Sequence, residues 1–306
     1  MILDKKEKGQ MFPVQSHEIC AVVVTYNRLA MLCKCIEQIR NQNVPCDILV
    51  VNNASTDGTK DWLEQQSNQA EGMHVFHSSQ NLGGAGGFHL GIKMAVEAGY
   101  AYVWVMDDDC MPRCDGLEQL MKMDKKLKGQ YGWLSSRALW TDGTACRMNI
   151  QRRTPYQDIR DFDKPLIPAV MASFVSLLLP AVNVRTYGLP RKEFFIWADD
   201  WEYTRRISLK MPCYVVSESI VIHAMKQNSV VNIAKDTADR LERYRYAYRN
   251  DVYLYRREGV VGWVWIWMKN CYHSLLLIFS GHPNRIAVIW KGFCQGVRFK
   301  ISEERM

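Results

Sequence analysis

Three consecutive carboxylates, Asp107, Asp108 and Asp109, follow directly on the apolar run AYVWVM. Neighbouring carboxylates repel one another strongly unless a cation lies among them. Mg²⁺ and Mn²⁺ bind carboxylate and diphosphate oxygens together, so the motif predicts a metal held by the alternate residues Asp107 and Asp109, with a diphosphate completing the shell. A solvated acidic turn or an acidic helix N-terminus is the alternative interpretation.

A second acidic cluster, Trp197-Ala198-Asp199-Asp200-Trp201-Glu202, places carboxylates among aromatic rings at the expected start of a helix. Aromatic faces beside carboxylates are typical of sugar sites, and an aspartate there can accept the proton of an attacking hydroxyl group. An acidic first turn that complements the helix dipole explains the same residues equally well. His223, at the end of IVIH, is either a core histidine or a nitrogen ligand of the metal.

Three polar loops follow apolar segments of the chain: residues 25–28, residues 52–57, and residues 81–87 with the string NLGGAGG. Asn and Asp side chains can bind a pyrimidine, and Arg28 can pair with a diphosphate, although ordinary turn chemistry also explains the first two loops. The glycines of the third loop allow a phosphate or a ribose to approach the backbone at a helix N-terminus. The string is neither GxGxxG nor a P-loop, which argues against a dehydrogenase or an ATPase; a purely structural turn remains open.

The elements that position these loops alternate between strand and helix. Short, β-branched apolar runs predict strands at residues 19–25, 47–52, 73–77 and 101–106. Helical spacing of apolar residues predicts helices at 29–39 with Asn27 as N-cap, from about residue 59, and after the glycine-rich turn up to Gly99. This order predicts an α/β fold with a mostly parallel sheet, whose ligands bind beyond the carboxyl ends of the strands.

The second half of the chain is less regular. Residues 130–170 predict loops with a β-hairpin, and strands are expected at 174–179, 213–217 and 220–223, with a helix at 198–210. From residue 236 the chain becomes helical and basic. Residues 260–280 are the most apolar stretch, but Lys269, Asn270 and His273 interrupt it, which favours an interfacial helix, with Trp263 and Trp267 on one face, over a membrane-spanning one.

The composition limits the partners and the compartment. The 306 residues carry 39 Lys and Arg against 32 Asp and Glu, a net charge of +7 that implies an anionic partner: nucleic acid, acidic lipid or a pyrophosphate-bearing substrate. The chain has ten cysteines, and its N-terminus is polar and lacks a secretory signal. Together these features predict reduced thiols in the cytosol. The two close cysteine pairs, Cys33 with Cys35 and Cys110 with Cys114, lack a matching second pair, which argues against zinc.

Taken together, the motifs resemble those of glycosyltransferase family 2, whose members have the GT-A fold, and within it the bacterial galactofuranosyltransferases. The likeness extends over about residues 18–255. It rests on VVVTYNR, VVNNASTDGT, NLGGAGGF, VWVMDDD, FIWADDWEY, His223 and YAYRN, in this order.

The resemblance implies a role for each matching residue. Asp107, Asp109 and His223 would bind Mn²⁺ or Mg²⁺, and Asp200 would be the catalytic base. The acceptor would be held by Trp197, Asp199 and Glu202, and the donor by Thr25, Arg28, Asn53, Asp57, Asn81, Gly83, Gly84 and Asp108. The motif with Arg249 and Asn250 would serve packing or pyrophosphate contact. Many family members have Asp where this chain has Asn52 and Asn53, which bears on the choice between UDP and dTDP donors.

We therefore expect an inverting, metal-dependent transferase with a GT-A catalytic domain at 18–235, an N-terminal extension at 1–17 and a helical, basic and aromatic region at 236–306. It would transfer galactofuranose from UDP-galactofuranose to a glycan or lipid-linked glycan acceptor during synthesis of an O-antigen-like bacterial polysaccharide. The expected location is the cytoplasmic face of the inner membrane, in peripheral contact with anionic lipid and without nucleic acid. The alternatives are a rhamnosyltransferase using dTDP-rhamnose, a nucleotidyltransferase and a non-catalytic nucleotide-binding module.

Overall fold

The computed structural model describes residues 16–229 and 232–301, so that the predicted N-terminal extension lies almost entirely outside the described part. The strands are β1 (Ile19–Thr25), β2 (Asp47–Asn52), β3 (Met73–His77), β4 (Tyr102–Asp107), β5 (Cys110–Pro112), β6 (Leu134–Leu139), β7 (Arg152–Thr154), β8 (Gln157–Asp158), β9 (Leu166–Pro168), β10 (Val175–Pro180) and β11 (Tyr214–His223). The helices are α1 (Leu29–Arg40), α2 (Thr59–Gln69), α3 (Gly83–Glu97), α4 (Gly116–Leu127), α5 (Ala181–Tyr187), α6 (Asp199–Ser208), α7 (Leu241–Tyr255), α8 (Gly259–Phe279) and α9 (Ile286–Arg298).

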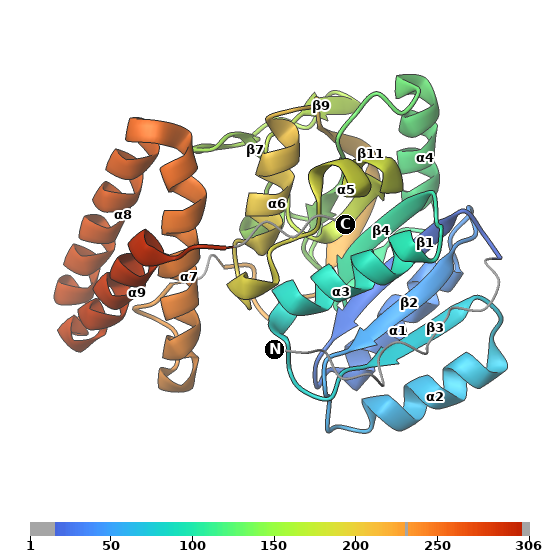
Figure 1. Ribbon diagram of the computed structural model, residues 1–306, viewed down its shortest axis with the longest axis horizontal. Helices are drawn as coiled ribbons and strands as arrows, with labels where there is room; N and C mark the ends of the chain where they lie inside the picture. Colours follow the sequence, from blue (N-terminus) through green and yellow to red (C-terminus); the bar gives the residue numbers. More distant parts are fainter. Residues whose placement is uncertain (1–15, 230–231, 302–306) are drawn as a thin grey trace.

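The main sheet has the strand order β3-β2-β1-β4-β10-β6-β11-β5, with β9 paired to β11. Strands β3, β2, β1 and β4 are parallel, and β11 is parallel to β6. Strand β10 runs antiparallel between β4 and β6. The expected mostly parallel α/β sheet is confirmed, and its four neighbouring parallel strands bring their carboxyl ends to one edge (Figure 1).

Helices cover both faces of this sheet, because alternate side chains of its buried strands point to opposite sides. On β1, Cys20, Val22 and Val24 pack with α3, α5 and α6. The intervening residues of β1, such as Ala21 and Val23, pack with α1, α2 and α4. Both faces are apolar, which explains why β1 has no polar alternation in the sequence.

Three local expectations are corrected. Residues 134–139, expected as loop, form β6 inside the sheet, whereas the expected hairpin is present as β7 and β8. Residues 214–223 form one strand with an irregularity between Val216 and Ile220 instead of two strands. Asn27 does not cap α1: the carboxylate of Asp57 accepts from the Leu29 backbone N–H, 3.0 Å away.

Helices α7, α8 and α9 form a group beside the sheet, on the left of Figure 1. A Cβ atom at Gly292 or Gly296 of α9 would come within 2.8 and 2.6 Å of α7, so these glycines permit the two helices to pack closely. Helix α8 buries a narrow stripe with Gly262, Ile266 and Asn270 and leaves most of its apolar surface exposed. Within residues 16–229 and 232–301, no helix is both long and apolar enough to cross a membrane.

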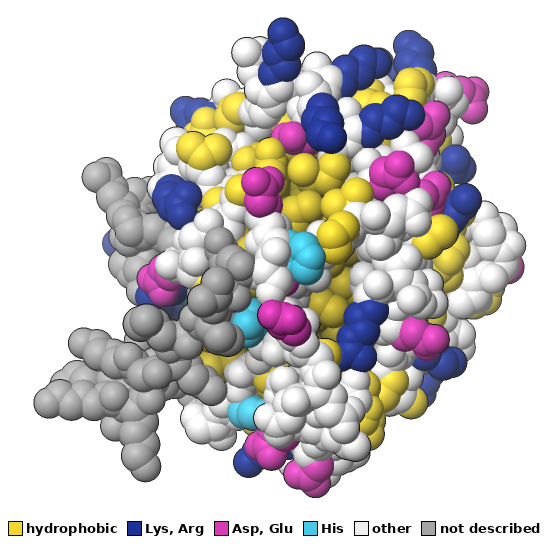
Figure 2. All heavy atoms as spheres, turned by 90° about the vertical axis from the view of Figure 1, so that its right-hand side faces the viewer, with side chains coloured by type: hydrophobic (Ala, Val, Ile, Leu, Met, Phe, Trp, Pro, Cys, Tyr) yellow, Lys and Arg dark blue, Asp and Glu magenta, His cyan; other side chains and the backbone are white. Residues whose placement is uncertain are grey.

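The opposite side of the molecule has a mixed surface. Figure 2 shows Lys and Arg interspersed with Asp and Glu on this face, around a strip of apolar side chains. Neither sign of charge predominates among the described residues of this face.

Candidate active site

The acidic motif lies at the carboxyl end of β4. Asp107 is the last residue of this strand and pairs with Val24 of β1, while Asp108 and Asp109 form the turn into β5. Thr25, at the end of β1, donates its hydroxyl hydrogen to Asp108 over 2.8 Å. The structure therefore brings the first predicted polar loop into direct contact with the acidic motif.

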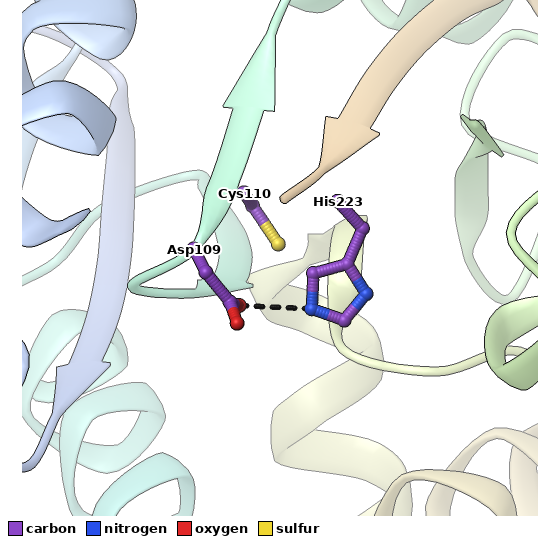
Figure 3. A group of neighbouring side chains, drawn as sticks. All are labelled: Asp109, Cys110 and His223. Carbon is purple, nitrogen blue, oxygen red and sulfur yellow. Dashed lines mark hydrogen bonds and ion pairs between the residues drawn. The ribbon is translucent and has the colours of Figure 1, made fainter. Parts of the chain in front are cut away.

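Arg28 and His223 supply the positive charge next to these acids. The Arg28 guanidinium bonds to Asp109 at 2.5 Å, and Nε2 of His223 lies 2.8 Å from the other Asp109 oxygen. Figure 3 shows the Asp109 carboxylate and the His223 ring turned toward each other from the ends of two different strands. This direct contact between residues 114 positions apart was expected from the resemblance alone.

Asn149 fixes the orientation of the His223 ring. The side-chain oxygen of Asn149 lies 2.8 Å from His223 Nδ1, and its amide nitrogen donates to Ser173 at 2.9 Å. Because that oxygen is only an acceptor, Nδ1 carries a hydrogen and Nε2 is the atom turned toward Asp109. Asn149 was missed in the sequence, where it lies in the irregular region without a local signal.

The pKa values of these groups reflect burial and mutual charge. Burial, and next the charge of Asp109, raises the pKa of Asp107 to about 7. Burial also raises the pKa of Asp108 to about 6, against the opposing effect of Arg28. For His223, burial lowers the pKa, but the hydrogen bond with Asp109 outweighs it and raises the value to about 10. The three carboxyl groups of the acidic motif thus outnumber the two cationic side chains beside them, Arg28 and His223.

The donor atoms fit a hard divalent cation. Ligand atoms of Asp109, Cys110 and His223 all lie within 4.8 Å of one another. Mn²⁺ and Mg²⁺ prefer oxygen to sulfur and Mn²⁺ also takes imidazole, whereas burial and nearby aspartates raise the pKa of the Cys110 thiol and keep it protonated. Carboxylate oxygens with the His223 imidazole are therefore the suitable set.

The two asparagines of the neighbouring loops hold each other in place. The buried amide of Asn53 donates to the side chain of Asn81 and to the carbonyl oxygen of Gly83, each at 3.0 Å, and accepts from Leu82 N–H. Asn81 in turn accepts from the Gly83 N–H at 2.8 Å. Both amides are thus used within the protein, where they fix the chain that enters α3.

The glycine-rich string forms the first turns of α3, where a turn before the helix was expected. Gly83 has φ = 73°, and a Cβ there would overlap the carbonyl oxygen of Phe195. A Cβ at Gly87 would come within 2.5 Å of Val24, which shows that this glycine serves the packing of α3 on β1. Gly84, by contrast, has open space at its Cβ position.

The segment before α6 is strained and held by α7. The φ angles of Phe195, Trp197 and Ala198 are 63°, 64° and 63°, and residues other than glycine rarely adopt such values. The fully buried amide of Asn250 donates to the carbonyl oxygens of residues 194, 196 and 197 at 2.9–3.0 Å. This contact gives the YAYRN motif a packing role that stabilises the strained segment.

Asp199 and Asp200 begin α6 directly after this segment. Asp200 accepts from the Trp201 N–H at 2.7 Å, as expected of an acid at a helix N-terminus. Burial, followed by the charge of Asp199, raises the pKa of Asp200 well above its ordinary value, and Asp107 of the acidic motif adds to the shift. Asp200 therefore lies within electrostatic reach of the carboxyl end of β4.

Two predicted site residues have their carboxylates bonded within the protein. Glu202 is buried and pairs with Arg206, at 3.1 Å from one oxygen and 3.2 Å from the other. Asp57, which stays exposed, accepts from Leu29 and Thr59. Trp197, the third residue expected at the acceptor, packs edge-on against Tyr244 of α7.

The chain is similar to known proteins in sequence and in fold. The model of the family described as Glycosyl transferase family 2 matches residues 20–172. The galactofuranosyltransferase GlfT1 of Mycolicibacterium smegmatis is 27% identical over 205 residues, which cover 62% of this chain and 65% of that protein. The chain thus spans less than two thirds of the length of the curated relatives that it matches.

Two solved structures share the architecture. A mannosyltransferase from Pyrobaculum calidifontis, in complex with GDP-Man and Mn²⁺, has a TM-score of 0.56 at 15% identity and covers 97% of this chain and 81% of its own. S. aureus TarS 1-349, in complex with UDP-GlcNAc, has a TM-score of 0.52 at 15% identity and covers 76% of this chain and 66% of its own. At these identities the likeness is one of fold.

Proposed function

Because the chain belongs to glycosyltransferase family 2 and has the GT-A fold, we propose that it transfers a sugar from a nucleotide diphosphate donor to a glycan acceptor. The observation that carries the proposal is the arrangement at the carboxyl end of β4, where Asp109 lies against both Arg28 and His223. A single displacement needs a diphosphate site and a base on opposite sides of the anomeric carbon. The bound UDP-GlcNAc and GDP-Man of the two solved structures support a nucleotide-sugar donor.

In this proposal Asp200 accepts the proton of an acceptor hydroxyl group as the oxygen attacks the anomeric carbon. The bond from that carbon to the diphosphate breaks on the opposite side, UDP leaves, and the anomeric configuration inverts. The raised pKa of Asp200 suits this role, since a carboxylate whose pKa is raised takes up a proton more effectively than an ordinary one. Asp199 and Trp197 lie beside Asp200 and would contact the acceptor.

Asp107, Asp109 and His223 would hold a Mn²⁺ or Mg²⁺ ion, which would supply positive charge to the leaving diphosphate. The unbalanced carboxylates and the ring orientation set by Asn149 support this assignment, as does the Mn²⁺ in the mannosyltransferase structure. Thr25 and Asp108 are hydrogen-bonded to each other and Arg28 is half-exposed beside them, so these residues border the expected place of the donor. Gly84 leaves room for the donor. Asn53, Asn81 and Gly83 shape the loop that leads into α3 and borders the same place.

The galactofuranosyltransferase relative supports UDP-galactofuranose as the donor. We retain dTDP-rhamnose as the alternative, because Asn52 and Asn53 stand where many family members have aspartate. Both oxygens of Glu202 are engaged by Arg206, so Glu202 is assigned to the support of α6 rather than to the acceptor.

A lipid-linked acceptor and a peripheral membrane position are supported by the surface of α8. Its single charged residue, Lys269, is bonded to Asp251 at 2.7 Å, and its exposed face is apolar. The exposed large side chains are Val260, Val261, Trp263, Val264, Trp265, Trp267, Met268, Tyr272, Leu275, Leu276, Ile278 and Phe279. Such a face, with several tryptophans and with the exposed cations Lys291 and Arg298 on the adjacent α9, suits the interface of an anionic bilayer.

The experiment is a product assay with purified protein, an acceptor glycan and Mn²⁺, in which UDP-galactofuranose, UDP-galactopyranose and dTDP-rhamnose are compared. Release of UDP from UDP-galactofuranose alone, lost on chelation, is the expected result. Turnover of dTDP-rhamnose alone would retain glycosyl transfer and replace the sugar. Pyrophosphate as product would instead indicate a nucleotidyltransferase, and absence of turnover with every donor would contradict the proposed function.

A further inference from the structure

A basic cavity of about 600 Å³ lies between α7 and the C-terminal end of α9, outside the candidate active site. One wall is a single face of α7, with Glu242, Arg245, Tyr246 and Arg249 at helical spacing. The other wall includes Arg298 and Lys300. Four cationic side chains thus surround the cavity together with one carboxylate.

Among the described residues, the positive charge of this cavity is not balanced. Arg245 bonds to Glu242 at 3.1 Å, but its buried Nε has no hydrogen-bond partner in the described part of the chain. Among the carboxylates whose side chains the structure describes, none lies within ion-pair distance of Arg249, Arg298 or Lys300. A buried donor without a partner beside several unpaired cations is the arrangement that an anionic ligand would complete.

Aromatic rings hold Arg249 in a fixed position. Its guanidinium lies 4.1 Å from the ring centre of Phe299 and 4.9 Å from that of Tyr246. Its Nε bonds to Asn250 and one Nη to the Glu193 and Phe194 carbonyl oxygens. A guanidinium held in this way loses little conformational entropy when it binds, and its other Nη group is left to donate to a phosphate oxygen.

We propose that this cavity is a binding site for a phosphate or diphosphate group, distinct from the donor site. Its size suits a small anionic group rather than an extended polymer. The Tyr246 ring also packs on Phe195, with 5.1 Å between ring centres, and Phe195 belongs to the strained segment that leads to Asp199 and Asp200. A phosphate in the cavity therefore lies next to the acceptor side of the active site. Its source is either an acceptor that carries a diphosphate or the head group of a membrane lipid.

The first test is a calorimetric titration of the full chain with inorganic pyrophosphate in metal-free buffer. The double variant Arg298→Gln/Lys300→Gln removes two exposed cations for which the structure gives no internal bond. Loss of their charge-assisted contacts should weaken pyrophosphate binding about tenfold or more. Lys291→Gln, which removes an exposed cation of α9 outside the cavity, is the control and should bind like the wild type. Arg28→Gln alters the donor side, so it reports pyrophosphate that binds there and should leave binding in the cavity unchanged.

The second test identifies the source of the phosphate. An alkyl-diphosphate-linked acceptor is compared with the same glycan without diphosphate, and sedimentation with phosphatidylglycerol vesicles is compared with sedimentation with phosphatidylcholine vesicles. A higher KM of the double variant for the diphosphate acceptor alone assigns the site to the acceptor; a loss of phosphatidylglycerol binding alone assigns it to lipid. The titration and the vesicle assay need no turnover, so they stay interpretable if the proposed transfer reaction fails.

The proposal is overturned if wild-type protein does not bind pyrophosphate. It is equally overturned if Lys291→Gln weakens binding as much as the double variant, or if only Arg28→Gln weakens it, because pyrophosphate would then bind by general surface charge or at the donor site.

Discussion

The side-chain oxygen of Asn149 lies 2.8 Å from Nδ1 of His223, and this contact turns Nε2 of the ring toward Asp109. The two residues come from distant parts of the chain: Asn149 follows β6 in an irregular segment, and His223 is the last residue of β11. A metal-binding histidine usually needs such a partner on its second nitrogen, because the partner selects the tautomer and fixes the ring plane. Asn149 is thus as much a part of the proposed metal centre as the three ligands.

Replacing Asn149 should weaken metal binding without unfolding the protein. In Asn149→Leu the ring of His223 loses the acceptor for its Nδ1 hydrogen, and we expect the affinity for Mn²⁺ to fall about 10- to 100-fold. Isothermal titration of the purified variant with Mn²⁺ measures this change. Asn43→Leu, at an exposed asparagine beside Glu118, is the matched control and should retain wild-type affinity. Equal Mn²⁺ affinity of Asn149→Leu and wild type would exclude His223 as an oriented ligand.

The neighbouring glycines Gly83 and Gly84 should respond in opposite ways to a methyl group. Gly83→Ala places a Cβ against the Phe195 carbonyl oxygen at a positive φ angle, so we expect the free energy of unfolding to fall by about 2 kcal/mol or more. Gly84→Ala meets open space in a helix and should be neutral or slightly stabilising. Chemical denaturation followed by circular dichroism compares the two variants. A Gly84→Ala protein of normal stability but weaker donor binding would support a donor contact at Gly84, and equal stabilities of the two variants would contradict the close approach of α3 to Phe195.

The pH dependence of transfer should depend on Asp199. Asp200 must be ionised to accept a proton, and its raised pKa means that activity is lost as the pH falls through a value well above that of an ordinary aspartate. The charge of Asp199 contributes to this shift, second only to burial. In Asp199→Asn the acidic limb of the kcat profile should therefore move to lower pH. The profile is measured at saturating donor and acceptor, and an acidic limb that stays at the wild-type position would argue against Asp200 as the titrating base.

Asn270 should cost the protein stability. Its side chain is fully buried in α8, and neither amide atom has a hydrogen-bond partner within the part of the chain that the structure describes. A buried polar group without a partner costs about 1–3 kcal/mol, so Asn270→Leu should raise the free energy of unfolding by an amount of this order. Urea denaturation measures the difference, with the exposed Asn43→Leu as a control. A less stable Asn270→Leu protein would mean that the amide is hydrogen-bonded in solution.

Much of the first half of the fold follows from the sequence, because its strands are buried on both faces. The expected strands at 19–25, 47–52 and 73–77 coincide with β1, β2 and β3, since continuous apolar, β-branched runs are typical of strands in a buried parallel sheet. The parallel order then brings the loops of Thr25 and Asn53 to the end of β4, as predicted. Here local pattern and tertiary structure agree.

Strand β6 was not predictable, because polar contacts rather than apolar packing hold its centre. Ser136 is fully buried and its hydroxyl group bonds to Ser176 at 2.5 Å and to Ser219 at 2.6 Å. Ser135 accepts from Gln151 at 2.9 Å. These partners are 16 to 83 residues away in the sequence, so hydrophobic periodicity indicates only a polar, irregular segment.

The candidate site also contains residues that the sequence identifies and residues that it does not. The acidic motif was singled out because its residue types carry the chemistry, whereas the roles of His223 as metal ligand and Asp200 as base came from the resemblance and stay predictions. Residues that only orient them have side chains whose role depends on distant partners: His223 is 74 residues from Asn149, and the carbonyl groups bonded to Asn250 are 53 to 56 residues away. Glu202 and Asp199 were both expected at the acceptor. The i to i+4 pair of Glu202 with Arg206, visible in the spacing, is the signal that separates them.

The most direct test of the central claim is the turnover of Asp200→Asn with a donor that the wild-type protein uses, together with donor affinity measured by titration with UDP and Mn²⁺. The amide keeps the size of the side chain and cannot accept the proton, so we predict a fall in kcat of about 10²- to 10⁴-fold with unchanged affinity for UDP. A variant that turns over at the wild-type rate would contradict the assignment of Asp200 as the base of an inverting transfer.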